Sequence, residues 1–405
     1  MLSKSIGYRQ SMISGKGAAS PSGTPPTYSV SYSTAVEHYT GSNLYNQINV
    51  VVDSSLGSGV VFWAECDGLA NSYFKSNSNV ASGTTDANGN VTINVILSPT
   101  SYNSNSSSFT LNVRTTDPVA GQIIDSKTGN VVTTAITVSS NVDTAIETIT
   151  TVNDQTMYMY QASGNSIVSG DSVLTGTSGG EGNLWVDSYA TFDYFIVGGG
   201  GRAGDLNAGG GGAGGIIQGN IIVDSTTARD LNVGSCGEFT NEGNSWVFGN
   251  TNIAYQGGNY STTQSVRNGA SGAGGFNDAN VNYAPGVSIY SGQGNDGGSI
   301  TPGSGGGAGG GGYSSVGEDE AEGAGGAGYV SDFTGSNVTY STGGAGQASY
   351  TYNGGTVLGS LYNLPGTGGS AGREISSLPR KVSFGAPGLV AVKLQGNVNH
   401  SVVLD

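Results

Sequence analysis

Apolar and polar residues alternate over short runs in the first third of the chain. In Val91–Leu97 every second residue, counted from Val91, is Val, Ile or Leu, and Phe109–Thr115 repeats the pattern with Phe, Leu and Val. Successive side chains of a β-strand point to opposite faces, so each run is predicted to be a strand with one face in a core. Asp86–Gly89 contains the Asn-Gly pair that is typical of a hairpin turn.

Strands of this kind follow one another at intervals of roughly ten residues, which is the spacing of a β-sandwich. The predicted strands are Tyr28–Ser33, Asn46–Val52, Val60–Glu65, Val91–Leu97, Phe109–Thr115 and Val131–Val138. We therefore expect one antiparallel, immunoglobulin-like (Ig-like) sandwich over residues 27–140.

Three segments of this region, GSGVVFWAECDG, ASGTTDANGNVTINVIL and SSFTLNVRTTDPVAGQIIDS, carry a resemblance to a known module. An aromatic pair, Phe62-Trp63, precedes a turn, and a later Phe-Thr-Leu-x-x-Arg-Thr strand leads to a glycine corner at Gly121. The pattern resembles a Calx-β-like module, a sandwich of marine cyanophage structural proteins. Related modules bind calcium through clustered acids. Asn71–Phe74 and Ser104–Ser107 stand where those acids are usual, which disfavours a calcium site here.

Residues 141–191 connect this sandwich to the rest of the chain and have strand signals of their own. Met157–Tyr160 and Asn183–Val186 are rich in apolar residues, and such side chains need a packing partner. We interpret the segment as connecting strands that enter the last domain, with Trp185 packed under its glycine-rich part.

The last domain, residues 192–405, begins with a buried strand that runs directly into glycine. Phe192–Val197 contains the aromatic and β-branched residues of a packed strand, and the glycine tracts 198–201 and 209–215 follow. Glycine loses more backbone entropy on folding than any other residue, so these tracts indicate that backbones must approach closely. In polyproline II geometry all N–H and C=O groups point sideways, where neighbouring glycine helices can pair them. We predict an all-β fold in which polyglycine II-like loops project from a β-framework.

The motifs of this domain occur in a characteristic order. FDYFIVGGGG is followed by GGGGAGGIIQGNIIV, DLNVGSCG and NSWVFGNTNIAYQGG, then by GSGGGAGGGGY and GAGGAGYV, and GAPGLVAVKL comes last. This order resembles the glycine-rich domain of phage tail-fibre and virion surface proteins. A similar arrangement occurs in the extracellular glycine-rich region of a receptor tyrosine kinase family. The resemblance covers about half of the chain and implies bundled polyglycine II loops on a β-framework.

The glycine tracts do not fit a nucleotide-binding site. Gly198 and Gly200 imitate the start of a dinucleotide fingerprint, but residues 204–209 cannot form the helix that would hold the pyrophosphate. No glycine run is closed by the Gly-Lys-Ser/Thr of a phosphate loop. We expect no cofactor-binding residue.

Catalytic and metal sites are equally unsupported. Glu318–Glu320 and Glu322 are expected to form a solvated acidic loop, with no burial to raise a carboxyl pKa and no rigid cage for a metal. His38 and His400 are the only histidines, and neither lies in a stretch that suits a general base. We predict a non-enzymatic protein with no catalytic residue, no cofactor and no metal.

Composition narrows the class of partner. The formal charge of -15 disfavours nucleic acid as a partner, because nucleic acid selects for basic patches.

The two cysteines, Cys66 and Cys236, lie far apart and are expected to be free, buried thiols. No apolar run is long enough to cross a bilayer, so we expect no membrane insertion.

The first 26 residues reverse the sign of the charge. They contain Lys4, Arg9 and Lys16 and no acid, and end in a Gly/Ala/Ser/Pro-rich stretch typical of a linker. Two interpretations explain this composition equally well: a frayed terminus, or a basic arm that attaches the chain to an acidic assembly. We choose the attachment arm as the hypothesis.

Tyrosines are spaced through the glycine-rich half. Tyrosine offers a large contact area at little entropy cost, so rings on loop tips are candidates for recognition, whereas rings inside would pack the glycine bundle. The candidate receptor contacts are Tyr290, Tyr313, Tyr329 and Tyr340.

These inferences converge on a structural protein of a tailed phage, located on the virion surface. Its arm would bind other virion proteins, its sandwich would act as a spacer, and its glycine-rich domain would bind a host cell-surface glycan or protein. We expect a homo-oligomer, with a trimer as one option. The alternatives are a capsid decoration protein or head fibre with a cementing or weakly adhesive role, and a polysaccharide-degrading tail spike. A secreted adhesin is disfavoured because no signal-peptide pattern is seen.

Overall fold

The computed structural model shows an all-β protein, as predicted. It describes residues 26–38, 44–97, 107–118, 120–143, 145–162, 179–187, 190–204, 207–223, 228–236, 243–249, 251–278, 281–303, 305–346, 364–369, 385–395 and 398–405. Within these ranges the helices are one α-helical turn, α1 (Gln264–Arg267), and one 3₁₀ turn, η1 (Asn71–Tyr73). No helix in the described ranges has the length and apolar character needed to cross a membrane.

The chain divides into two compact units that do not follow the order of the sequence. Unit 1 comprises Met1–Ile136 together with Val398–Asp405, and unit 2 comprises Thr137–Asn397. The expected connection 141–191 therefore belongs to unit 2, and the end of the expected domain 192–405 belongs to unit 1. Unit 2 is an insertion between two strands of unit 1.

Unit 1 is a sandwich of two antiparallel sheets, in the orders β1-β2-β5 and β23-β7-β6-β3-β4. The strands of the first sheet are β1 (Tyr28–His38), β2 (Leu44–Ser54) and β5 (Asn90–Leu97). Those of the second are β3 (Val61–Asp67), β4 (Val80–Thr84), β6 (Ser107–Thr115), β7 (Ile123–Ala135) and β23 (Val398–Leu404).

The core of unit 1 lies between these two sheets and is built by period-two alternation. β5 buries every second side chain, from Val91 to Leu97, as its sequence predicts. Phe62 on β3 is fully buried and packs edge-on against Tyr28 on β1, with ring centroids 5.9 Å apart. Val402 on the C-terminal strand joins the same core, so the last residues of the chain complete a sandwich begun by the first strands.

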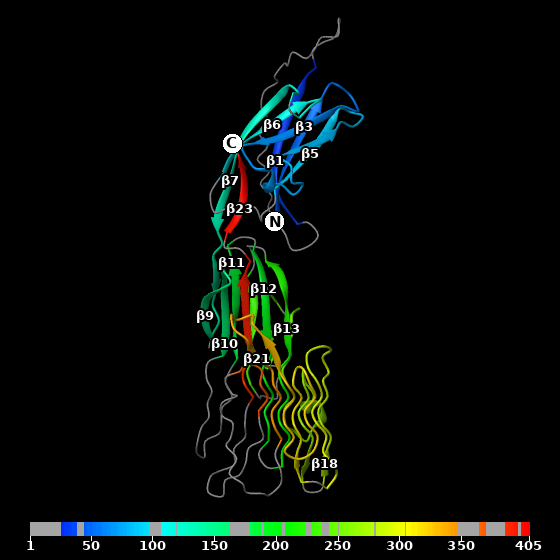
Figure 1. Ribbon diagram of the computed structural model, residues 1–405, viewed down its shortest axis with the longest axis vertical. Helices are drawn as coiled ribbons and strands as arrows, with labels where there is room; N and C mark the ends of the chain where they lie inside the picture. The colour runs from blue at the N-terminus through cyan, green and yellow to red at the C-terminus, as the bar shows by residue number, and fades with distance from the viewer. Residues whose placement is uncertain are drawn as a thin grey trace. The chain divides into compact units, whose positions relative to one another are not determined.

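Unit 2 has a framework of two five-stranded antiparallel sheets, β13-β12-β22-β10-β9 and β16-β15-β14-β11-β8 (Figure 1). The first sheet contains β9 (Ala145–Val152), β10 (Gln155–Ala162), β12 (Ala190–Val197), β13 (Ile216–Val223) and β22 (Leu389–Leu394). The second contains β8 (Val138–Ser140), β11 (Gly180–Val186), β14 (Arg229–Val233), β15 (Ser245–Trp246) and β16 (Ile253–Ala254).

Large side chains fill the space between the two framework sheets. Phe192 on β12 is fully buried and contacts Phe248, with ring centroids 5.2 Å apart. Leu184 on β11 is buried as well, while its neighbour Trp185 is half-buried. The strands predicted at 157–160 and 183–186 thus belong to this framework.

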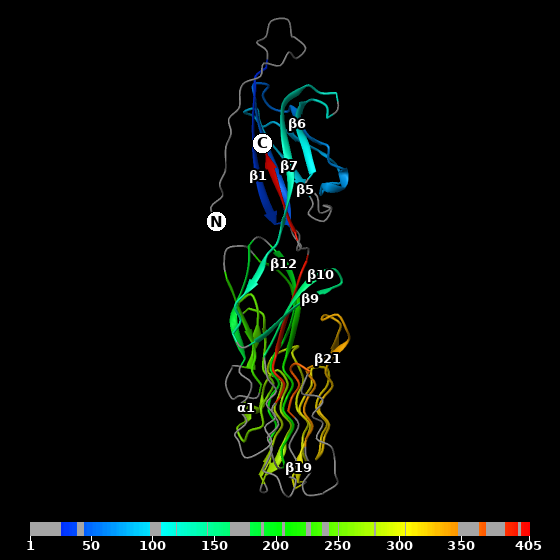
Figure 2. The ribbon, with the colours of Figure 1, turned by 90° about the vertical axis from the view of Figure 1, so that its left-hand side faces the viewer.

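Glycine tracts continue from the framework strands and run side by side beyond one end of the sheets (Figures 1 and 2). β12 leads into 198–201, the tract 209–215 leads into β13, and 385–388 leads into β22. Short ribbons accompany the tracts: β17 (Phe276–Asp278), β18 (Val281–Tyr283), β19 (Gly306–Gly307), β20 (Tyr329–Ser331) and β21 (Val338–Tyr340).

Candidate functional site

The tract 209–215 is the centre of the glycine bundle, and its hydrogen bonds repeat every three residues. Amides three positions apart donate to the same neighbouring tract, with N···O distances of 2.7 to 3.0 Å. Residues 210 and 213 donate to residues 308 and 311, residues 211 and 214 donate to 369 and 366, and residues 212 and 215 donate to 258 and 255. A repeat of three without any positive φ in the tract is the signature of polyproline II geometry.

The carbonyl groups of the same tract accept bonds from three further tracts. Residues 201 and 198 donate to 212 and 215, residues 274 and 271 donate to 210 and 213, and residue 344 donates to 211. One tract is therefore surrounded by six others, which pair its backbone polar groups without any regular strand ladder. This is the side-by-side pairing expected of polyglycine II helices.

The packing explains why the tracts must be glycine. A Cβ added to Gly210 would meet the carbonyl oxygen of Gly344, and one added to Gly211 would meet that of Gly201. Both contacts are closer than 3.0 Å, a distance that real Cβ atoms essentially never show. The absence of side chains is thus a condition of the bundle, and the bundle in turn gives the loops at its ends a fixed base.

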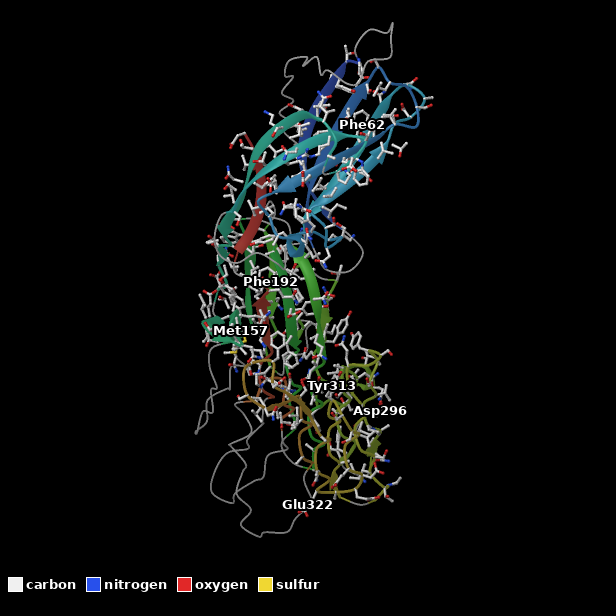
Figure 3. The ribbon with its side chains drawn as sticks, turned by 45° about the horizontal axis from the view of Figure 1, so that its top comes forward. Phe62, Met157, Phe192, Asp296, Tyr313 and Glu322 are labelled. Atoms are coloured by element: carbon white, nitrogen blue, oxygen red, sulfur yellow. The ribbon has the colours of Figure 1, made fainter. Side chains whose placement is uncertain are left out.

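The far end of the bundle, opposite the framework sheets, carries reversing turns. β18 and β19 lie there, and Glu322 lies at the same end, far from the framework residue Phe192 (Figures 1–3). The turns are bonded to one another: Asn282 Nδ2 donates to the carbonyl of Ile300 at 3.4 Å, and the amide of Glu320 donates to Ser299 at 2.7 Å. The far end is therefore a connected surface.

Carboxylates hold these turns through backbone amides. Asp319 Oδ1 accepts the amide of Ser299 at 2.7 Å, and Glu318 Oε2 accepts that of Ala324 at 3.2 Å. The acidic run is exposed, as the sequence predicts for a solvated loop. No group of three or more His, Cys, Asp or Glu side chains suited to a metal is found in the described part of the chain.

The candidate tyrosines lie nearer the framework than the far end. Tyr340 is 2% exposed, its ring meets Phe195 edge-on at 4.9 Å, and its hydroxyl shares a 2.8 Å hydrogen bond with Thr334. The expectation that Tyr340 is displayed is therefore wrong. Burial also raises the pKa of Tyr340, and the hydrogen bond to Thr334 partly offsets this increase.

Tyr313, Tyr329 and Tyr290 are partly buried. Tyr313 packs edge-on against Tyr329 at 5.2 Å, and Tyr329 stacks on Phe195 at 6.3 Å. Tyr290 stacks face to face on Tyr255 at 3.5 Å. Burial raises the pKa of Tyr290 and of Tyr313, with a smaller contribution from the neighbouring tyrosine. These rings close the junction between bundle and framework, and Tyr313 lies between Phe192 and Glu322 in Figure 3.

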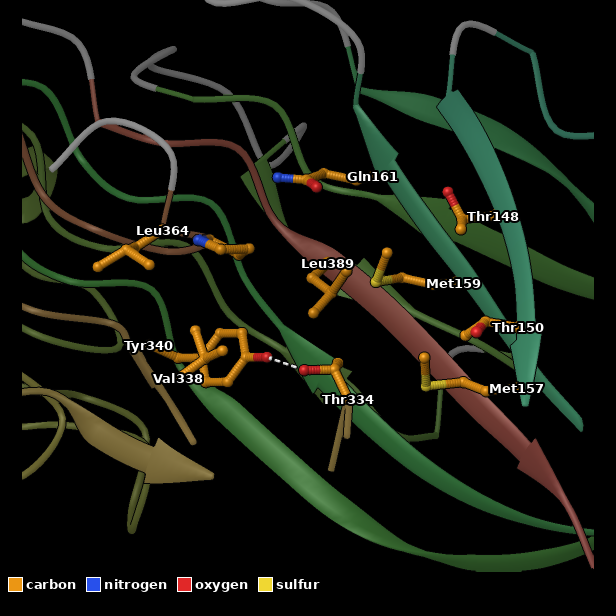
Figure 4. A pocket seen from close by; sticks show the side chains of 11 residues that line it. Thr148, Thr150, Met157, Met159, Gln161, Thr334, Val338, Tyr340, Leu364 and Leu389 are labelled. Carbon is orange, nitrogen blue, oxygen red and sulfur yellow. Dashed lines mark hydrogen bonds between the residues drawn. The ribbon is translucent and has the colours of Figure 1, made fainter. Parts of the chain in front are cut away.

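A groove of about 310 Å³ lies where the β20–β21 hairpin faces β10 and β22 (Figure 4). Its surface combines methyl and thioether groups with hydroxyls and an amide, and none of its described lining residues is charged. The lining residues are Thr148, Thr150, Met157, Met159, Gln161, Thr334, Val338, Tyr340, Leu364, Pro365 and Leu389. Such a surface can hold an uncharged group and offers no strong acid or base.

This groove was not predicted from the sequence, although a signal for it exists. In the strand MYMY, Met157 and Met159 alternate with Tyr158 and Tyr160, so the thioethers share one face of β10. That face of β10 becomes one wall of a groove only because the β20–β21 hairpin lies opposite it.

The remaining expectations concern residues outside this region. Lys4, Arg9 and Lys16 lie outside the described residues. Cys66 and Cys236 are both buried and neither forms a disulfide, as predicted. Burial, with a smaller effect of the neighbouring Glu65, raises the pKa of the Cys66 thiol to about 12.

Comparisons with protein families, with curated proteins and with solved structures give no match to this chain. The geometry of the chain itself is therefore the basis for a functional assignment.

Proposed function

We propose that this chain is a non-enzymatic structural protein of a phage virion, a fibre or spike component whose glycine-rich unit attaches the particle to a host surface. The observation that carries the proposal is the bundle of seven mutually bonded tracts around residues 209–215. A bundle of this kind holds exposed reversing turns on a rigid base, and binding loses less entropy when the binding loops are already ordered.

The chemistry of the far end supports attachment through several weak contacts. Its exposed groups are short polar and acidic side chains, such as Asp278, Thr301 and Glu320, together with Val281, which is 51% exposed. Contacts of this kind are individually weak, so useful avidity needs several copies on one particle. The expected partner is a host cell-surface glycan or protein, and the expected assembly is a homo-oligomer on the virion surface.

Labelling tests the location. Gold-conjugated antibodies raised against the full chain should decorate intact particles of the phage that encodes it, at the end of a fibre or spike. Decoration spread over the capsid shell would favour the alternative, a capsid decoration protein or head fibre. Particles that carry no label, and no peptide of the chain in mass spectrometry, would refute the virion assignment.

Binding without turnover tests the activity. The full chain coupled at many copies to beads should retain host cells of that phage, whereas the soluble chain at the same total concentration should not. No oligosaccharide should be released from the cells. Release of sugar that copurifies with the chain would instead support the tail-spike alternative.

A further inference from the structure

Two chain segments join unit 2 to unit 1, and both belong to neighbouring strands of one sheet. β7 ends at Ala135 and β23 begins at Val398, and these two residues are register partners. The ladder between the strands continues through seven pairs to Gly129 and Leu404. The two connections therefore leave the sandwich side by side.

The N-terminal entry lies at the other end of the sandwich. β1 begins at Tyr28 and β7 begins at Ile123, and close to these starts the Tyr32 hydroxyl donates to Asp125 Oδ2 at 2.9 Å. β1 and β7 run in the same direction (Figure 2). The chain thus enters unit 1 at one end of its strands and leaves toward unit 2 at the opposite end.

We infer that the β7–β23 pair is a mechanical clamp, which transmits tension between the N-terminal segment and unit 2 without opening the sandwich. Tension between these points acts along the strands. Either β1 must then slide past β2, to which it is bonded over eleven register pairs, or β7 must slide past β6, to which it is bonded over eight, from Ser107–Val131 to Arg114–Ile123. Antiparallel hydrogen bonds lie perpendicular to the strands, so they are all loaded at once in shear.

Core packing adds to this resistance. Val131 on β7 and Val402 on β23 are 0% and 7% exposed, and both belong to the core that includes Phe109 and Leu111 of β6. If the β7–β23 pair slid, Val131 and Val402 would have to move past the β6 side chains at the same time. Within unit 2, the segments continue into β8 of one sheet and β22 of the other, and β22 is bonded on both sides, to β10 and to β12.

Pulling on the C-terminus loads the same strands differently. Asp405 follows the last residue of β23, where its amide donates to Thr128 at 3.0 Å and its carbonyl accepts Lys127 Nζ at 2.9 Å. A force applied there peels β23 from β7 one pair at a time, beginning at Leu404. The structure therefore predicts a strong direction and a weak direction for one and the same sandwich.

Single-molecule stretching of the full chain tests this inference. The exposed Thr301 is replaced by Cys as an attachment point, since Cys66 and Cys236 are both buried. The Thr301→Cys protein is held at its N-terminus and pulled either through residue 301 or through a C-terminal tag. Unfolding of the strands from Tyr28 to Ala135 releases about 38 nm of extended chain, at ~3.5 Å per residue, and is recognised by a length gain equal to this value less the span of the folded sandwich.

The sandwich should open at a clearly higher force when pulled through residue 301 than through the C-terminus, at the same pulling rate. The molecule is identical in both arms, so its thermodynamic stability cannot produce the difference. Equal forces, or a lower force through residue 301, would overturn the clamp. An early step from unit 2 has a different length and does not obscure the comparison.

Discussion

Replacement of Gly211 by Ala tests the bundle most directly, because it adds one carbon atom at the centre. The new Cβ would meet the carbonyl oxygen of Gly201, and ordinary van der Waals contact begins only at 3.4 Å. The tract 198–201 must then move away from 209–215. This movement breaks the bonds from the amides of residues 201 and 198 to residues 212 and 215, at 2.8 and 2.9 Å.

The cost can be worked from those two bonds. A buried hydrogen-bonding group left without a partner costs about 1–3 kcal/mol, so two bonds amount to about 2–6 kcal/mol. Alanine also lowers the conformational entropy of the unfolded chain, which stabilises the folded state by at most about 1 kcal/mol. For a unit of this size each kcal/mol lowers the melting temperature by about 2–4 °C. We expect Gly211→Ala to lower the melting temperature of unit 2 by several degrees or more, and Gly210→Val or Gly211→Val to prevent its folding.

The matched control adds the same atom where there is space. Gly303 has a φ of +88°, and a Cβ added there would have no other atom within 4 Å. Gly303→Ala therefore adds only the strain of a left-handed alanine, about 1–2 kcal/mol. Calorimetry of the full-length chain resolves the effect. If Gly211→Val leaves unit 2 folded, with a transition shifted no further than by Gly303→Ala, the tracts are not packed as a bundle and the reasoning fails.

Three further predictions concern unit 1 and the N-terminal segment. Val402→Ala should lower the free energy of unfolding of the sandwich by about 1–2 kcal/mol in denaturant titrations, whereas Val403→Ala, 47% exposed on the same strand, should not. Folding raises the pKa of the Cys66 thiol from 9.0 to about 12, so the folded chain keeps this proton up to a higher pH than the unfolded chain. The thiol therefore contributes fully to the free energy of unfolding below pH 9, and this contribution is lost as the pH rises toward 12. Between pH 9 and 10 the fall in stability should be smaller for Cys66→Ala, and an unchanged slope would contradict this. Removal of residues 1–26 should leave both melting transitions in place but abolish incorporation into particles, and normal incorporation would remove the attachment arm from the proposal.

The tyrosines show where composition misleads. Residue type alone cannot separate a ring that is displayed from one that packs, because both uses favour a large aromatic group beside small residues. Tyr340 follows the polar residue Thr339 on a short strand, and its burial depends on Phe195, which lies far away in sequence. The far-end surface instead contains Asp319, Glu320 and their neighbours. The sequence predicted only that these residues form a solvated loop.

The sequence by itself determined the all-β class and the strands whose alternation is strong, such as Val91–Leu97, because period two is a local property of the chain. It also indicated that the tracts 198–201 and 209–215 need close backbone contact, since ordering glycine costs more backbone entropy than ordering any other residue. Only the tertiary structure decided which tracts are neighbours, because backbone hydrogen bonds between glycines carry no side-chain code for a partner. The same holds for the last strand: Val398–Leu404 could pair with any free edge, and only the closed sandwich assigns it to β7.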